Sequence, residues 1–222
     1  MRKPVNILKL IIAVLLCCSV ISSNGQDPDR FLKRVEALDS MQYKFCPQKK
    51  LALFTGSSSI FMWKDIQSYF PHFNVINNGF GGSHFSDLLY FYDRLIIKHS
   101  PDFLFIYEGD NDVAYKKKVS EIVKTAKTII NRAVKDLPDT KIIIISAKPS
   151  IAREHLKNEY ILLNKRLEKL CKRYPEVEFA DIWSAMTDEN GNVFKDIFLD
   201  DGLHMNKKGY QIWAESLSEF LN

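Results

Sequence analysis

The sequence predicts an α/β domain with a five-stranded parallel sheet and helices on both of its faces. Short apolar runs alternate five times with longer amphipathic segments along the 222 residues. Such alternation requires parallel strands joined by right-handed helical crossovers. The run at 141–146 contains four consecutive isoleucines, which is typical of a strand buried on both faces. The composition, 46% hydrophobic and 26% charged, fits one globular domain of ordinary size.

Turn residues mark where the predicted elements begin and end. We expect strands at 50–55, 73–77, 103–107, 141–146 and 177–182. The first strand stops at Gly56 and the third at Gly109, and a glycine in that place is typical of a turn. Amphipathic periodicity predicts helices at 30–43, 59–69, 84–98, 117–137, 154–174 and 206–221. The first of these helices follows Asp27-Pro28-Asp29, a helix-start signal.

The N-terminal segment has the order of a secretory signal peptide. Three cations precede an apolar run at 10–21, and small and polar residues follow it. The run is shorter than the roughly 20 residues that cross a bilayer. Ser23 and Gly25 suit the small positions before a cleavage site, so we expect residues 1–25 to be removed and the mature chain to begin at Gln26. The prediction is therefore a secreted or periplasmic domain at 26–222, with no stable membrane span after cleavage.

Two other interpretations of this segment are an uncleaved membrane anchor and a lipoprotein acylated at Cys17 or Cys18. Large residues precede both cysteines, which argues against acylation. Removal of the signal lowers the formal net charge from +4 to about +1. A nearly neutral domain lacks the electrostatic footprint of a nucleic-acid-binding protein. The Lys116-Lys117-Lys118 run is explained most simply as a solvated helix start.

The remaining cysteines, Cys46 and Cys171, lie far apart in the sequence. In an exported protein they could form a disulfide, or they could be two buried thiols. No CxxC pattern or histidine-rich spacing suggests a metal site.

The unusual polar residues gather where predicted strands end, which is where parallel sheets bind ligands. The groups are Gly56-Ser57-Ser58-Ser59, Gly79-Phe80-Gly81-Gly82, Gly109-Asp110-Asn111-Asp112 and, before the last helix, Asp200-Asp201-Gly202-Leu203-His204. Acyl transfer by serine needs a base on the hydroxyl, an acid that orients the base, and donors for the oxyanion. Each part is available: a serine at a strand-to-helix turn, a glycine amide, an asparagine side chain, and Asp201 three residues before His204.

Each residue also has a purely structural interpretation. Ser58 could be a helix N-cap, as could either serine beside it, and the glycines could serve only their turns. Asn111 and Asp201 could be caps, and His204 could be a surface histidine. The glycines do not match the dinucleotide-binding pattern. The order of the four groups and their placement at strand ends together favour a catalytic site.

These four groups resemble the conserved blocks of the SGNH/GDSL hydrolases, and the resemblance extends from Leu51 to Trp213. The family carries a Gly-Asp-Ser-Leu block, a glycine block, a Gly-x-Asn-Asp block and an Asp-x-x-His block in that order. The match implies Ser58 as nucleophile, His204 as base and Asp201 as acid. It implies an oxyanion hole formed by Ser58, Gly82 and Asn111. Ser57 departs from the family, because it stands where the family has aspartate.

The resemblance further implies a flavodoxin-like three-layer α/β/α fold and ester hydrolysis without metal or cofactor. We expect a small-molecule or carbohydrate ester as substrate, with acetyl esters of carbohydrate first. Lysophospholipid or thioester hydrolysis is the second expectation, and a binding module that has lost its chemistry is the third. Other residues near strand ends are assigned no role; they are Trp63, Glu108, Lys148, Pro149, Ser150 and Arg153.

Overall fold

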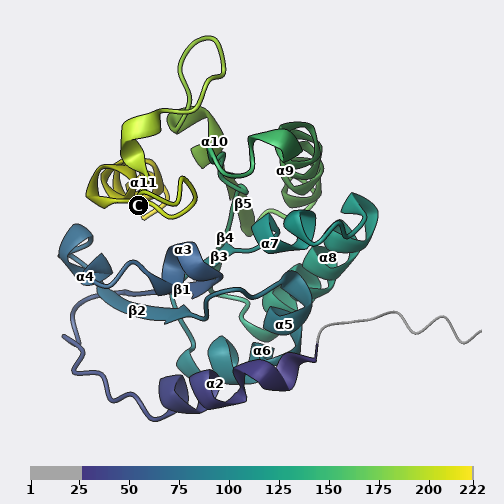
Figure 1. Ribbon diagram of the computed structural model, residues 1–222. Helices are drawn as coiled ribbons and strands as arrows, with labels where there is room; N and C mark the ends of the chain where they lie inside the picture. Colours follow the sequence, from purple (N-terminus) through teal and green to yellow (C-terminus); the bar gives the residue numbers. More distant parts are fainter. Residues whose placement is uncertain (1–26, 222) are drawn as a thin grey trace, which may run out of the picture.

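The computed structural model describes residues 27–221, and the expected signal peptide and cleavage site lie outside the described residues. Five strands form one parallel sheet in the order β2-β1-β3-β4-β5 (Figure 1). The strands are β1 Leu51–Gly56, β2 Asn74–Gly79, β3 Phe103–Tyr107, β4 Lys141–Ile145 and β5 Val177–Ala180. This is the flavodoxin-like strand order, whose switch point lies between β1 and β3. The predicted parallel sheet is confirmed.

Helices cover both faces of the sheet and make three layers (Figure 1). One face carries α2 Leu32–Asp39, α5 Phe85–Tyr90, α6 Tyr92–Leu95, α8 Val119–Asp136 and α9 Lys157–Cys171. The other face carries α3 Ser58–Phe61, α4 Ile66–Tyr69, α10 Ile182–Ala185 and α11 Lys207–Ser218. A short helix, α7 Asp110–Ala114, follows β3, and 3-10 turns lie at Pro28–Phe31, Ile97–His99, Glu154–Leu156 and Lys195–Ile197.

Alternation along the strands builds two separate cores. Ile142 and Ile144 of β4 pack into the core beneath α8 and α9, whereas Ile143 and Ile145 pack into the core beneath α11. All four side chains are at most 1% exposed. The isoleucine run is therefore a central strand with two buried faces, as its sequence predicts.

The predicted helix at 59–69 is wrong, because the structure divides it into α3 and α4. Trp63 lies between them and is fully buried, with its ring 5.0 Å from that of Tyr210. The side chain of Asn77 donates to the carbonyls of Ile60 and Trp63, at 2.7 and 3.0 Å. These bonds satisfy the carbonyls that an interrupted helix leaves open. Burial of the indole thus outweighs continuation of the helix.

The predicted helix at 84–98 is likewise divided, into α5, α6 and a 3-10 turn. The chain leaves this segment through Ser100, which has a left-handed φ of 44°. The predicted strand at 177–182 ends at Ala180, and α10 begins at Ile182. Both short helices that the sequence did not predict, α7 and α10, begin at the carboxyl end of a strand. No helix within residues 27–221 is long and apolar enough to cross a membrane.

Candidate active site

The turn after β1 brings Ser58 to the carboxyl edge of the sheet. Gly56 has a φ of +127°, and a Cβ there would lie 1.9 Å from the carbonyl oxygen of Tyr107 on β3. Only glycine allows this close approach of two strands. The next amide, that of Ser57, donates to the same Tyr107 carbonyl at 3.0 Å. Ser58 then begins α3 with its side chain half-buried.

Ser58, His204 and Asp201 form a continuous hydrogen-bonded series. His204 Nε2 lies 3.1 Å from Ser58 Oγ, although the two residues are 146 positions apart in the chain. His204 Nδ1 lies 2.6 Å from Asp201 Oδ2. The other carboxylate oxygen, Oδ1, accepts the amides of Leu203 and His204, both at 2.9 Å. The turn therefore holds the carboxylate and the imidazole in one orientation toward the serine.

These contacts also set the charge of the Asp201 carboxyl. Burial alone would raise its pKa, but hydrogen bonds from the His204 ring and from the two amides together outweigh that effect and lower the pKa to about 2. The carboxylate is thus ionised at any ordinary assay pH. An ionised partner at Nδ1 favours the tautomer that presents an unprotonated Nε2 to Ser58 Oγ.

Two backbone amides at this turn, those of Ser58 and Gly82, are free hydrogen-bond donors. Gly82 is exposed and has a φ of +88°, and a Cβ there would meet no atom within 4 Å. Among the described residues, no acceptor engages the amide of Ser58 or that of Gly82. Both amides are therefore free to bind an anionic oxygen.

Asn111 lies beside this serine turn, but its amide already has partners. Its Nδ2 donates to Ser57 Oγ at 2.6 Å and to the Ser83 carbonyl at 3.0 Å. Asn111 is 8% exposed and Ser57 is 1% exposed. Ser57, which stands where the family that the sequence resembles carries aspartate, is thus the direct partner of Asn111.

A buried charged cluster, which we call the Asp110 cluster, lies next to Asn111. Its anion is Asp110, and its cations are Lys148 and Arg153. Arg153 Nη1 lies 2.5 Å from Asp110 Oδ1, and Lys148 Nζ lies 3.8 Å from Asp110 Oδ2. The hydroxyls of Tyr107 and Tyr160 also donate to the carboxylate, at 3.0 and 2.8 Å. Burial by itself would raise the pKa of Asp110, but the two cations hold that pKa below its usual value.

The sequence pattern by itself indicates no role for these cations. The signal available was their position, since Lys148 and Arg153 closely follow the end of β4 on the ligand-binding edge of the sheet. Glu108 also received no role. It is fully buried, burial raises its pKa well above the usual range, and it shares a 2.5 Å hydrogen bond with Ser83 Oγ. Burial therefore disfavours the charged form of Glu108, which accepts the Ser83 hydroxyl and so supports the residue whose carbonyl Asn111 binds.

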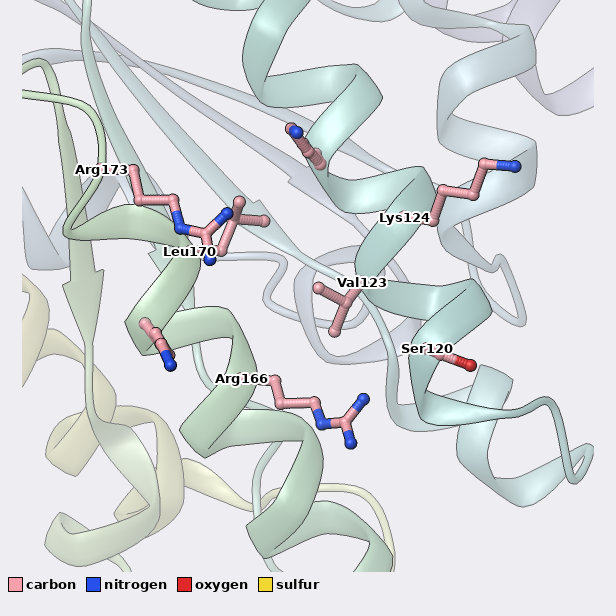
Figure 2. Close-up of a pocket in the computed structure, with 8 residues that line it drawn as sticks. Ser120, Val123, Lys124, Arg166, Leu170 and Arg173 are labelled. Atoms are coloured by element: carbon pink, nitrogen blue, oxygen red, sulfur yellow. The ribbon is translucent and has the colours of Figure 1, made fainter.

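The cysteines and a basic hollow on the surface lie apart from the site. Cys46 and Cys171 are free thiols, and burial raises the pKa of Cys171 to about 12. A hollow of about 320 Å³ lies between α8 and α9 (Figure 2). It is lined by Ser120, Val123, Lys124, Lys127, Arg166, Lys169, Leu170 and Arg173. It contains none of the residues around Ser58. Within residues 27–221, no group of three or more His, Cys, Asp or Glu side chains is arranged to hold a metal.

Solved structures of similar architecture come from several bacteria. One from Streptococcus pneumonia, described as a platelet activating factor, has a TM-score of 0.76 and 22% identity, covering 99% of this chain and 100% of the other. A GDSL-like lipase from Bacteroides thetaiotaomicron has a TM-score of 0.70 and 20% identity, with 87% and 96% covered. An acetylxylan esterase from Geobacillus stearothermophilus, in a catalytic mutant form, has a TM-score of 0.63 and 18% identity, with 80% and 96% covered.

At these identities the similarity establishes the fold. A search of curated proteins found no match to this sequence. A sequence model of the GDSL-like Lipase/Acylhydrolase family, however, matches residues 56–212, which span most of the chain and all four strand-end groups. On that match, the chain belongs to the GDSL-like lipase/acylhydrolase family and is a hydrolase of the ester-cleaving kind.

Proposed function

We propose that this protein is a serine esterase that cleaves acyl esters through a covalent intermediate on Ser58. The observation that carries the proposal is the series Ser58 Oγ, His204 Nε2, His204 Nδ1 and Asp201 Oδ2, with separations of 3.1 and 2.6 Å. A hydroxyl in this setting has a base within hydrogen-bond reach, and the base has an oriented anionic partner.

The proposed reaction has two halves. His204 Nε2 takes the Ser58 proton while Oγ bonds to the carbonyl carbon, and the carbonyl electrons move to its oxygen. The tetrahedral species then collapses, the bond to the alcohol oxygen breaks, and His204 returns its proton to the leaving alcohol. In the second half, His204 Nε2 takes a proton from water while the water oxygen bonds to the acyl carbon. The new tetrahedral species collapses, the bond from that carbon to Ser58 Oγ breaks, and His204 returns the proton to Oγ, which releases the carboxylic acid and restores Ser58.

The developing oxyanion would be bound by the amides of Ser58 and Gly82 and by Asn111 Nδ2. The two amides are free. Asn111 Nδ2 donates to Ser57 Oγ at 2.6 Å. To bind the oxyanion, it must either share that hydrogen between the two oxygens or give up its bond to Ser57. Removal of one such donor typically lowers kcat by about 10²–10³. We therefore expect Asn111→Ala to lower kcat strongly and to leave KM for a short ester nearly unchanged. If the variant keeps the kcat of the wild type, Asn111 serves only as a cap of its turn.

The proposed substrate class is short acyl esters, with acetyl groups on carbohydrate first. Support comes from the acetylxylan esterase of similar fold, and the N-terminal segment of the sequence supports a secreted or periplasmic site of action. A series of acyl lengths on nitrophenyl esters and on acetylated oligosaccharides tests this class. Faster turnover of long chains than of acetate would favour lysophospholipids or thioesters instead.

The acid partner has a matched control in its neighbour. Asp200 is exposed, and its side chain makes none of the contacts to His204 that Asp201 makes. We expect His204→Ala to be nearly inactive, Asp201→Ala to keep measurable activity, and Asp200→Ala to resemble the wild type. Greater damage in Asp200→Ala than in Asp201→Ala would reverse the assignment of the acid.

A further inference from the structure

Both ends of the Asn111 side-chain amide have hydrogen-bond partners: acceptors at its nitrogen and a donor at its oxygen. Its Nδ2 donates to Ser57 Oγ and to the Ser83 carbonyl, while its Oδ1 accepts from Arg153 Nη2 at 3.1 Å. A guanidinium carries donors only, and a carbonyl oxygen is an acceptor only. A reversed amide would set its NH2 against Arg153 and its oxygen against the Ser83 carbonyl. Arg153 therefore favours the one orientation of the Asn111 amide in which the NH2 group faces the serine turn.

Arg153 is itself fixed in this place. Its second nitrogen, Nη1, pairs with Asp110 Oδ1 at 2.5 Å, so the planar fork spans two adjacent residues of α7. A lysine has a single charged nitrogen and does not reproduce such a fork. Because the Asp110 carboxylate is buried, little water competes with Arg153 for it. The Arg153 side chain keeps 18% of its surface exposed.

The segment that carries Arg153 also contacts the turn that carries His204. The amide of Ala152 donates to the Gly202 carbonyl at 3.0 Å. Lys148 Nζ donates to the Leu203 carbonyl at 2.7 Å. The chain after β4 thus touches the asparagine on one side and the acid–base turn on the other.

We propose that Arg153 is a positioning residue of this esterase, which holds and polarises the Asn111 amide as an oxyanion donor. The inference rests on the proposed function. A positive charge on Oδ1 draws electron density from the amide, which makes the NH2 hydrogens stronger donors. Arg153 does not touch the reacting atoms, so its effect on the reaction passes through Asn111.

The test is a double-mutant cycle between these two residues. Arg153→Met should lower kcat by about 10- to 100-fold, the value of one hydrogen bond to a charged group, with KM for nitrophenyl acetate nearly unchanged. Arg153→Lys keeps the charge without the fork and should recover only part of that loss. In the Asn111→Ala background, Arg153→Met should have little further effect, because the two changes remove the same donor.

Two further measurements separate positioning from folding. Asp110 keeps Lys148, Tyr107 and Tyr160 as partners in Arg153→Met, so thermal unfolding should remain cooperative. Added guanidinium ion should raise kcat of this variant at concentrations far below those that unfold proteins, since the vacated position reaches the surface. Arg166→Met, an exposed arginine of the α8–α9 hollow, is the matched control and should show neither loss nor rescue (Figure 2).

The outcomes are distinct. If Asn111→Ala is slow while Arg153→Met has full kcat, or if the two losses multiply, Arg153 does not act through Asn111 and the inference is overturned, but the esterase proposal stands. If Ser58→Ala retains activity, the esterase mechanism itself fails and the inference fails with it. The assignment is supported if Arg153→Met lowers kcat, if this loss is not additive with that of Asn111→Ala, and if added guanidinium ion restores part of the kcat.

Discussion

Three adjacent serines should respond differently to alanine substitution, because the fold gives each hydroxyl a different environment. Ser58 Oγ is half-buried and lies 3.1 Å from His204 Nε2. Ser57 Oγ is buried and accepts from Asn111 Nδ2 at 2.6 Å. Ser59 is a buried residue of α3, and its carbonyl accepts a hydrogen bond from the Tyr210 hydroxyl at 3.1 Å. We therefore expect the loss of activity at Ser58 and the larger loss of stability at Ser57.

The magnitudes follow from these contacts. Ser58→Ala deletes a partly exposed hydroxyl, which costs less than about 0.5 kcal/mol of stability, whereas loss of a nucleophile lowers kcat by about 10⁶. Ser57→Ala removes the acceptor of a buried N–H group. The Asn111 amide keeps its bond to Ser83, so we expect a cost of about 1–2 kcal/mol and a fall in Tm of about 2–8 °C. Substantial activity should remain in Ser57→Ala and in Ser59→Ala.

Thermal unfolding and turnover of nitrophenyl acetate measure the two effects on the same preparations. Labelling with a serine-directed phosphonate, followed by peptide mass spectrometry, identifies the nucleophile independently. The reasoning would be refuted by a label on Ser57 or Ser59, or by an active Ser58→Ala variant. A Ser57→Ala variant as stable as the wild type would show that its contact with Asn111 contributes nothing to folding.

Further predictions concern pH and backbone geometry. Because the pKa of Asp201 is about 2, its carboxylate should stay ionised throughout the assay range and add no ionisation to the pH–rate profile; an acidic ionisation that Asp201→Ala removes would contradict this. Since that pKa is depressed on folding, the stability that Asp201 contributes is present above pH of about 4 and is lost as the pH falls toward 2. Gly56→Ala should destabilise the fold by more than about 3 kcal/mol in denaturant titrations, since the new Cβ would overlap the Tyr107 carbonyl; Gly82→Ala, also at positive φ but with open space, should cost clearly less.

Local signals in the sequence were sufficient for the parallel sheet and for much of the candidate site. Periodicity and turn residues identify a strand from its own few residues, and the isoleucine run of β4 is an example. Asp201 and His204 are neighbours three positions apart, so their contact is a property of one turn. Because parallel strands present their carboxyl ends at one edge, the sequence alone predicts that Ser58 and Asn111 lie near each other.

Only the tertiary structure decided which groups these residues meet. Trp63 interrupts a helix because its indole packs against α11, a segment remote in sequence. The amide of Asn111 is committed to Ser57, and Arg153 joins it from a loop 42 positions away. No local pattern encodes these pairings, because they depend on how separate elements fill shared buried volume and satisfy one another's polar groups. The sequence by itself therefore determined the strands and the order of the polar groups, whereas packing determined the partners.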